Sequence, residues 1–370
     1  MAHSTSSAPS SVRARGFSFG RGAAAGVLLA ALVGCQAASP AATTLPPAPT
    51  APAATATLAP TAGPTAPPAQ TPRPAAPTPI AEWPRTVVDD EGTQVTLAAP
   101  PQRIASLTPA TTELVFELGE DDRLVGRGEY DDHPPAAAEL PAVATFTGVI
   151  HEQLVALEPD LVLAGGNFFT PPGDIERMRE LGIPVLVLYA PTVDAVLADI
   201  LLVGEAIGAT DAADELTADM RARMAEVTAA VADLERPRVF YQLGSEPEIY
   251  GPAPGSFIAH MIELAGGEPI TTTDPAVFAI SVERLVEEDP QVILVGDALF
   301  GACPGDVVVR PGWEQMTAVA DGAVREVDDT IITRPGPRLA EGLAALALAI
   351  HPDAELRPPT TAPAVCSPIL

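Results

Sequence analysis

Two stretches of the chain, EQLVALEPDLVLAG at residues 152–165 and ERLVEEDPQVILVG at residues 283–296, repeat one another without a gap. Glutamate, leucine, valine, proline and glycine recur at the same positions in both stretches. Each has apolar residues at helical spacing, then a proline, then an unbroken apolar run, which is typical of a short helix, a turn and a buried strand. The repeat predicts that the folded protein consists of two halves of similar construction.

Alternating strands and helices are predicted around both copies of the repeat. A leading hairpin at residues 83–99 comes first, and Thr108-Pro109 then begins a helix in the favoured order of cap and proline. The predicted strands are 104–107, 124–128, 161–164 and 185–189 in residues 81–190, and 239–243, 292–295 and 324–327 in residues 237–356; the predicted helices are 109–118, 152–157, 174–181, 256–265, 282–288, 313–319 and 339–350. This alternation predicts α/β lobes with mostly parallel sheets covered on both faces.

Residues 191–236 separate the two lobes and differ from both. Good helix formers run from Thr192 to Leu234 without proline, with apolar residues at helical spacing and glycines at positions 204 and 208. We expect one long bridging helix here, or a pair broken at a glycine. Two Rossmann-like lobes joined in this way form a ligand cleft between them, outside the carboxyl ends of the strands.

Residues 1–34 are typical of a signal peptide. Arg13, Arg15 and Arg21 precede an apolar run at residues 23–33 that is too short to span a bilayer. The run ends Leu-Val-Gly-Cys at residues 32–35, which matches the bacterial lipobox, so we expect Cys35 to carry a lipid. An ordinary signal peptide with an incidental cysteine is the alternative. We therefore expect an extracytoplasmic, lipid-anchored protein.

Residues 35–80 contain mainly alanine, proline and threonine and are expected to act as an extended, disordered tether. Two cysteines follow Cys35, at positions 303 and 366. In an exported protein an even remainder favours a disulfide, so Cys303 and Cys366 are expected to pin the C-terminal tail, residues 357–370, to the second lobe. Two unpaired thiols are the alternative.

The formal charge of −28, from 20 basic and 48 acidic residues, argues against nucleic acid or an anionic membrane surface as a partner. The histidines are scattered without the spacing of metal ligands, so no bare metal site is expected. Gly-x-Ser-x-Gly, Walker A and dinucleotide-binding patterns are absent from the sequence. On these grounds we do not expect an enzyme.

An ordered set of motifs resembles the vitamin-B12 and ferric-siderophore binding proteins of ABC importers. The set comprises RIASLTPATTELVFELG (103–119), DRLVG (122–126), YDDHPP (130–135), the two proline repeats, RPGW (310–313) and RPGPR (334–338). The resemblance covers roughly residues 85–352. It implies lobes bridged by a rigid helix and a monomer without an intrinsic cofactor. The implied cargo is cobalamin or a ferric chelate, and the implied partners are an ABC permease and its ATPase.

In this family one glutamate at the tip of each lobe pairs with arginine on the transporter, and the matching positions are Glu152 and Glu283. Acids in the first turn of a helix are also favoured by the helix dipole without any partner. A haem receptor of the same family is an alternative function. An exported metallocluster-type enzyme and a sensor or adhesion lipoprotein on the same fold are alternatives of other classes.

A corrinoid or iron-chelate pocket needs broad flat contacts and a few donors, so aromatic and polar residues near strand ends are candidates. These are Tyr130, Phe146, Phe168, Phe169, Tyr241, Gln242, Tyr250 and Phe278. Core or loop packing is the alternative for each. Arg334 and Arg338, with Arg127, could bind an anionic siderophore, or hold carboxylates of the protein around a Pro-Gly-Pro turn. For haem, Tyr130 or His133 is the candidate axial ligand. Gly165 stands where some B12 binders have a tryptophan, which is a departure from their pattern.

Overall fold

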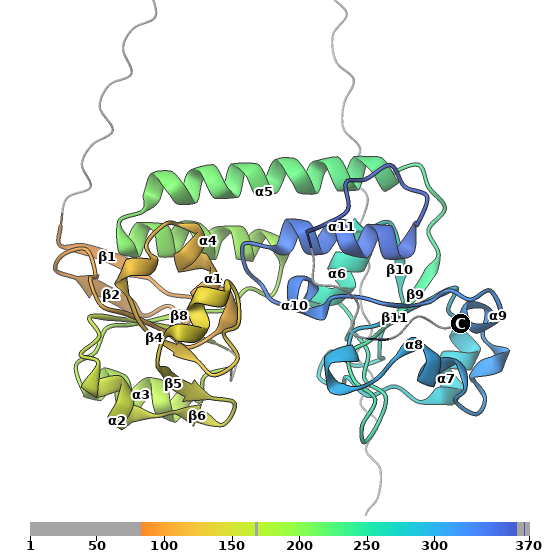
Figure 1. Ribbon diagram of the computed structural model, residues 1–370, viewed down its shortest axis with the longest axis horizontal. Coiled ribbons are helices and arrows are strands. Elements are labelled where there is room, and N and C mark those ends of the chain that lie inside the picture. Colours follow the sequence, from red (N-terminus) through yellow and green to blue (C-terminus); the bar gives the residue numbers. More distant parts are fainter. Residues whose placement is uncertain (1–82, 167–168, 361–365, 367–370) are drawn as a thin grey trace, which may run out of the picture. The chain divides into compact units, whose positions relative to one another are not determined.

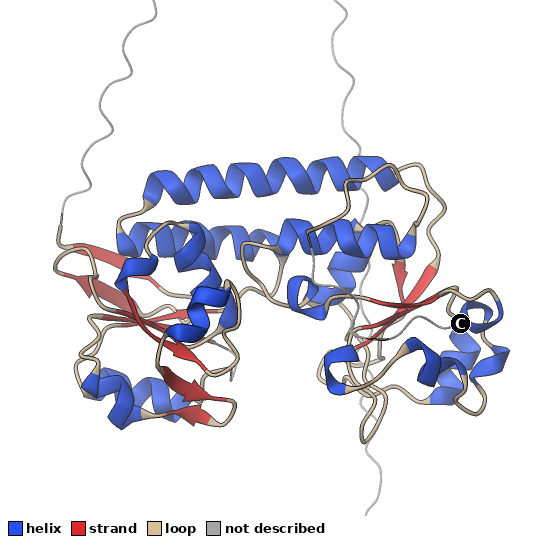
Figure 2. Cartoon of the chain, in the orientation of Figure 1, coloured by secondary structure: helices blue, strands red, loops and turns tan. Residues whose placement is uncertain are grey.

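The computed structural model describes residues 83–166, 169–360 and 366, and they form two α/β lobes beneath a layer of long helices (Figures 1 and 2). Cys35, the predicted signal peptide, the tether and Phe168 lie outside the described residues. Along the parts of the chain that are described, no helix is both long enough and apolar enough to cross a membrane.

The N-terminal lobe contains a six-stranded sheet in the order β6-β5-β4-β3-β7-β8, in which only the pair β5–β6 is antiparallel. Its strands are β3 (Ile104–Ser106), β4 (Leu124–Gly128), β5 (Ala142–Thr145), β6 (Gly148–Val149), β7 (Leu161–Gly165) and β8 (Val185–Leu188), and its helices are α1 (Pro109–Glu117), α2 (His151–Ala156) and α3 (Pro172–Glu180). The predicted parallel sheet is confirmed, although the short strands β5 and β6 were not predicted.

The C-terminal lobe has a four-stranded, wholly parallel sheet in the order β10-β9-β11-β12. Its strands are β9 (Arg238–Gln242), β10 (Glu268–Pro269), β11 (Val292–Val295) and β12 (Val324–Glu326), and its helices are α6 (Phe257–Leu264), α7 (Val282–Glu288), α8 (Pro304–Val308), α9 (Thr317–Ala320), α10 (Asp329–Ile332) and α11 (Leu339–Ile350). Single 3-10 turns occur at Asp121–Arg123, Pro135–Glu139, Ala298–Phe300 and Trp313–Gln315. The helix predicted at 313–319 is thus one such turn followed by α9.

The sequence repeat is also a structural repeat. In each copy the residue before the buried proline has a positive φ that is unusual for a non-glycine residue, 46° at Glu158 and 45° at Asp289. In each copy an arginine at the first strand of the lobe caps the end of the helix. Arg103 donates to the Leu157 carbonyl at 2.6 and 2.9 Å, and Arg238 donates to the Asp289 carbonyl at 2.7 Å. The same backbone conformation and the same cap therefore hold helix and strand together in both lobes.

The segment between the lobes is a broken pair of helices, α4 (Val193–Ile207) and α5 (Thr210–Val231). The break falls at Gly208, whose φ of 83° is accessible to glycine without steric cost. Only α5 crosses from one lobe to the other; its 22 residues span about 33 Å, and it packs along both α4 and α11 (Figure 1). The predicted bridge is confirmed in its two-helix form.

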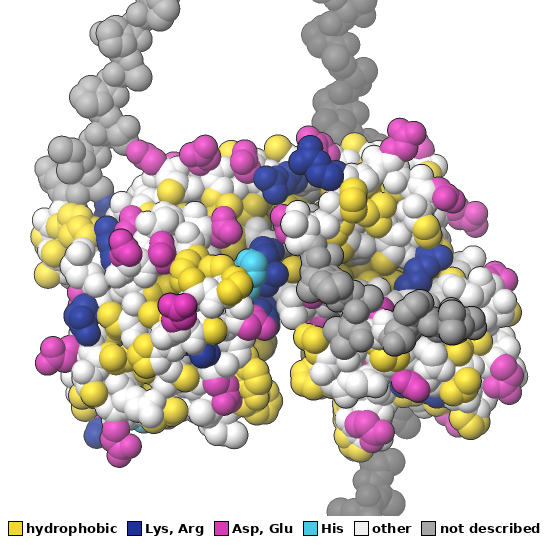
Figure 3. All heavy atoms as spheres, viewed as in Figure 1, with side chains coloured by type: hydrophobic (Ala, Val, Ile, Leu, Met, Phe, Trp, Pro, Cys, Tyr) yellow, Lys and Arg dark blue, Asp and Glu magenta, His cyan; other side chains and the backbone are white. Residues whose placement is uncertain are grey.

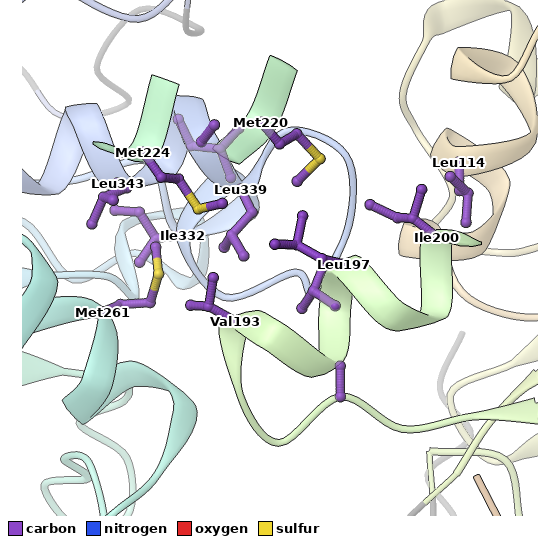
Figure 4. Packing of buried hydrophobic residues seen from close by; sticks show 14 of the residues in the cluster. Leu114, Val193, Leu197, Ile200, Met220, Met224, Met261, Ile332, Leu339 and Leu343 are labelled. Carbon is purple, nitrogen blue, oxygen red and sulfur yellow. The ribbon is translucent and has the colours of Figure 1, made fainter. Parts of the chain in front are cut away.

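One continuous apolar core runs through this helical layer into both lobes (Figure 4). Met220 and Met224 on α5 face Leu339 and Leu343 on α11, while α4 contributes Leu197 beneath them. Changing the angle between the lobes would open this close-packed core and separate side chains that attract one another, which costs free energy. The bridge therefore restrains the lobes strongly.

A leading hairpin covers the edge of the N-terminal sheet. Its strands are β1 (Arg85–Val88) and β2 (Gln94–Leu97), as predicted. The amide of Asp90 donates to the Val187 carbonyl at 3.1 Å, and the Asp90 carboxylate accepts from the amide of Tyr189 at 2.5 Å. The turn thereby satisfies backbone groups of β8 that an uncovered edge strand would leave unpaired.

Asp199 on α4 faces the carboxyl group of Asp90. Partial burial, and secondarily the negative charge of Asp90, raise the pKa of Asp199 to about 8. At neutral pH the carboxyl group of Asp199 is therefore mostly protonated and uncharged.

The predicted disulfide between Cys303 and Cys366 is confirmed, with an S–S distance of 1.98 Å and a Cα–Cα distance of 5.6 Å. Cys303 precedes α8, and the backbone amide of Cys366 donates to the Glu326 carboxylate at 3.1 Å. The bond joins residues 63 positions apart in sequence, so it ties the C-terminal end of the chain to the second lobe.

Removing this bond with Cys303→Ser and Cys366→Ser should lower the free energy of unfolding by about 2–4 kcal/mol, because the unfolded chain regains the entropy of an open loop. Urea unfolding of the double variant and of the oxidised wild type measures the difference. Mass spectrometry of the unreduced, unfolded wild type after alkylation checks the bond directly. Two alkylated thiols would contradict it.

Asp199→Asn should flatten the dependence of stability on pH. Between an unfolded pKa near 3.8 and the folded value of about 8, unfolding releases a proton from Asp199. The stability present at acid pH is therefore lost as the pH rises toward about 8. As the pH rises from about 5 to about 8, the wild type should lose this stability and the variant should not. The melting temperature of the variant should therefore increase relative to that of the wild type over this range. Asp219→Asn, at an exposed position on α5, is the control, and a constant difference for Asp199→Asn would refute the assignment.

Candidate functional site

A cavity of about 710 Å³ lies between the lobes, at the ends of strands from both sheets. The N-terminal lobe contributes the segments that follow β3, β7 and β8, and the C-terminal lobe contributes the segment that follows β9. Residues 333–336, between α10 and α11, complete its wall. This is the cleft that the two-lobed architecture predicts, because the carboxyl ends of parallel strands of both sheets meet there.

A second cavity, of about 570 Å³, also has walls from both lobes. Asp132 and His133, which follow β4, face segments that follow β11 and β12, and Pro359 and Thr360 near the C-terminal end lie beside them. Its described lining is acidic: it includes Asp132, Glu326, Asp328 and Asp329, together with Arg338. We refer to the two spaces as the apolar cavity and the acidic cavity.

An ion-pair cluster stands between the two cavities and joins the lobes. Glu113 on α1, only 2% exposed, accepts from Arg338 at 2.6 and 2.8 Å and from Arg334 at 3.2 Å. Arg334 also donates to Asp132 at 2.7 Å. The two arginines around the Pro-Gly-Pro turn thus hold carboxylates of the protein, which was the alternative to binding an anionic siderophore. Arg334 still reaches the apolar cavity, and Arg338 reaches the acidic cavity.

Asp131 supports the loop that carries this cluster. Its carboxyl group accepts from the Thr112 hydroxyl at 2.5 Å and from the Gly128 amide at 2.9 Å. Burial raises the pKa of Asp131 to about 6, against the opposing effect of these two hydrogen bonds. It is 1% exposed and lines neither cavity, so its role is to shape the loop that positions Tyr130 and Asp132.

Exposed aromatic residues gather at the cleft ends of the strands. Among the residues that the structure describes, the exposed aromatic side chains are Tyr130, Phe146, Phe169, Tyr189, Phe278 and Phe300. Five of them follow β4, β5, β7, β8 and β11 within five residues, and Phe278 lies on the loop after β10. Figure 3 shows the surface hollowed between the lobes, with hydrophobic side chains on both sides of the hollow. Phe169, Tyr189 and Phe278 line the apolar cavity.

Two of these six, Tyr189 and Phe300, were not among the predicted candidates. Tyr189 was placed inside its strand, one residue beyond the end that the structure shows. Phe300 follows the strand of the second repeat, and its exposed neighbour Leu299 lines the acidic cavity. The sequence signal for both was position alone, since each lies just after an unbroken apolar run.

Tyr241 and Gln242 were predicted to contact ligand, and this is corrected by the structure. Both are fully buried on β9, an interior strand whose two faces are covered. The Tyr241 hydroxyl donates to Asp329 at 2.7 Å, and burial raises the pKa of Tyr241 well above its usual value. The Gln242 amide donates to Asp297 at 2.6 Å and accepts from Arg310 at 2.7 Å. These side chains support the loops at the cleft and do not line either cavity.

Tyr250 is half-buried, and its backbone pairs with Gly244 in a short bridge. It lines neither cavity, so it belongs to the supporting loop. Arg127 is occupied as well, because it donates to the carbonyls of Gly128, Glu129 and Ala138. In the described part of the chain, no group of three or more histidine, cysteine, aspartate or glutamate residues is arranged to hold a metal ion.

Glu152 and Glu283 lie in the first turns of α2 and α7, as predicted, and both are exposed. These helices occupy the ends of the two lobes that are farthest from α5 (Figure 1). Neither glutamate lines a cavity. The repeat thus places one acid at equivalent points of the two lobes.

Comparison with known proteins agrees with this architecture. A family model described as periplasmic binding protein matches residues 104–330. The cobalamin-binding protein of Halobacterium salinarum is 34% identical over 73% of this chain and 74% of its own length. An uncharacterized ABC transporter substrate-binding lipoprotein of Bacillus subtilis is 30% identical over 73% of this chain and 87% of its own length.

Solved structures show the same fold. The periplasmic vitamin B12 binding protein of Vibrio cholerae superposes with a TM-score of 0.60 at 27% identity, covering 68% of this chain and 97% of that one. A periplasmic heme binding protein of Pseudomonas aeruginosa superposes with a TM-score of 0.61 at 27% identity, covering 70% and 96%. With its two parallel-sheet lobes, its helical bridge and its interlobe cleft, this chain belongs to the periplasmic binding protein family that supplies solutes to ABC importers.

Proposed function

We propose that the protein captures a bulky, flat metal complex, a corrinoid in the first place, and delivers it to an ABC permease. The observation that carries this proposal is the ring of exposed aromatic side chains at the cleft ends of the strands. Exposed aromatics are costly to keep in water unless a ligand covers them, and their broad faces match a macrocycle. The relatives named for cobalamin and vitamin B12 binding support the same cargo.

A ferric siderophore and haem are the other cargoes that a cleft of this kind suits. Haem is favoured by one observation: Tyr130 is 59% exposed on the loop after β4, and His133, three residues later, lines the acidic cavity. Either side chain would supply an axial ligand to iron. A haem complex would therefore show a Soret band that changes in Tyr130→Phe or His133→Ala, whereas cobalamin binding would not depend on these ligands.

The compartment proposed is the outer face of the cytoplasmic membrane or the periplasm, with lipid on Cys35 and residues 36–80 as a tether. Leu-Val-Gly-Cys at residues 32–35 supports it, as does the disulfide, which forms in oxidising compartments. The relative from Bacillus subtilis is named a lipoprotein. The protein is proposed to act as a monomer, without catalysis.

Glu152 and Glu283 are proposed to dock the protein on the permease. A carboxylate at the surface of each lobe tip remains solvated in the free protein and can pair with an arginine of the transporter. Their equivalent positions in the repeat mean that a transporter with two similar subunits would meet the same group on each lobe.

Removing an aromatic face should weaken cargo binding. Phe169→Ala and Phe278→Ala each delete a ring that lines the apolar cavity, and each should lower the affinity for cyanocobalamin about tenfold or more, given the apolar area that the ring would cover. Isothermal calorimetry on the purified protein measures this. Leu234→Ala, an exposed residue distant from the cavities, is the matched control. The proposal fails if the wild type binds neither corrinoid, haem nor ferric siderophore.

Replacing both docking acids should separate binding from uptake. In Glu152→Gln/Glu283→Gln the affinity for cargo should be unchanged, since neither residue lines a cavity. Uptake of labelled cargo through the importer should fall, because truncating one partner of an interfacial charge pair costs about 2–5 kcal/mol. The control is Glu215→Gln/Glu226→Gln, which removes two exposed acids from α5. Normal uptake by the first double variant would show that its acids only start helices.

A further inference from the structure

We propose that the cleft selects uncharged metal complexes and rejects anionic ones, because Glu113 and Asp132 neutralise the two arginines that reach its cavities. This inference rests on the proposed function and narrows its cargo. Under this proposal Glu113 and Asp132 determine specificity, although the sequence did not mark either of them as a candidate.

Among the residues that the structure describes, two acidic or basic side chains line the apolar cavity, Asp199 and Arg334. Burial and the neighbouring Asp90 raise the pKa of Asp199 to about 8, so this side chain is mostly uncharged at pH 7. Arg179 on α3 pairs with Asp89 at 3.0 Å and with Glu91 at 3.4 Å, so its charge is already matched by carboxylates of the leading hairpin. Among the described lining residues, Arg334 is therefore the one positively charged side chain that could attract an anion.

The charge of Arg334 is already matched by the protein. Its guanidinium donates to Asp132 at 2.7 Å and to Glu113 at 3.2 Å. Arg338 donates twice to the same Glu113 carboxylate, at 2.6 and 2.8 Å. Two arginines face two carboxylates, so the cluster has no net charge. An anionic ligand would have to displace a carboxylate from a part-buried pair, which leaves that carboxylate without its partner.

The acidic cavity repels anions further. Apart from Arg338, the charged residues in the described part of its lining are Asp132, Glu326, Asp328 and Asp329. Asp328 and Asp329 lie at the start of α10 and are fixed there, Asp328 by the amide of Thr330 at 3.0 Å and Asp329 by the hydroxyl of Tyr241 at 2.7 Å. They cannot easily turn away from a ligand. A complex that enters between the lobes thus meets negative potential on one side and a neutral wall on the other.

Among the residues that the structure describes, no other arginine near the cleft adds an unpaired positive charge to it. Arg127 is bound by three backbone carbonyls, and Arg310 donates to Gln242 and lies over the ring of Trp313. Neither lines a cavity. The cargo that fits is electroneutral, with a flat face for the aromatic rim and amide or hydroxyl groups for the few polar contacts. Complexes that carry several carboxylates or catecholates do not fit.

Competition between probes of different charge tests this inference. Cyanocobalamin serves as the uncharged probe and a ferric tris-catecholate as the anionic probe. The iron of the tris-catecholate has no free coordination site, so its binding depends only on its charge and shape. The wild type should bind the first and bind the second at least about a hundredfold more weakly. Asp132→Asn gives the cluster a net positive charge at an exposed position, where the loss of the carboxylate costs little stability.

In Asp132→Asn the ratio of the affinity for the tris-catecholate to the affinity for cyanocobalamin should rise about tenfold, equivalent to about 1.4 kcal/mol. Glu268→Gln, an exposed acid outside both cavities, changes the net charge equally and should leave the ratio unaltered. Glu113→Gln, checked for folding by its melting curve, should act in the same direction as Asp132→Asn.

Three results would overturn the inference: equal affinity of the wild type for both probes, no shift in Asp132→Asn, or the same shift in Glu268→Gln as in Asp132→Asn. Each leaves the proposed function standing, because a cargo is still bound. Failure of the wild type to bind any corrinoid or chelate would overturn both.

Discussion

The carboxylate of Glu113 is the point on which the arrangement of the cleft depends. It comes from the first helix of the N-terminal lobe, yet its partners Arg334 and Arg338 belong to the segment that leads into α11. Leaving such a carboxylate buried without its arginines would cost about 3–5 kcal/mol. The pair therefore fixes the turn at residues 334–338 against α1, and this turn separates the apolar cavity from the acidic one.

The helical layer also fixes the two lobes relative to one another, on the other side of the cleft. The apolar core shared by α4, α5 and α11 joins the two lobes above, while the Glu113 cluster joins them below. A ligand that closed the cleft by a large angle would have to break both. The energetically accessible response is a small adjustment of the rim loops, where the exposed aromatics lie. Binding then depends on the shape and charge already present between the lobes.

Much of this fold could be predicted from the sequence, because the apolar periodicity of residues 104–128 and of the two repeats reflects local burial. The short strands β5 and β6 could not, since Ala142–Thr145 and Gly148–Val149 gain their strand structure only from pairing with β4 and with each other. The site was harder. Whether Arg338 faces a ligand or a carboxylate depends on Glu113, which is 225 positions away. Tyr241 and Gln242 were candidates because they lie near the carboxyl end of a strand, but β9 is an interior strand and both side chains are buried, which the sequence of the strand alone does not reveal.

The two lobes are alike at their tips but differ at the cleft. We attribute this difference to the different molecules that the two surfaces would contact. At the tips, the helix, the positive-φ residue and the arginine cap are the same in both lobes, down to Glu152 and Glu283. At the cleft the lobes differ: the N-terminal lobe offers Tyr130, Phe146 and the Asp132 loop, and the C-terminal lobe offers Phe278, Phe300 and acids. Under the proposed function, a partner with two similar subunits favours matched tips. A cargo without such symmetry favours cleft residues that differ between the lobes. The same repeat is therefore kept similar at the tips and becomes dissimilar at the cleft.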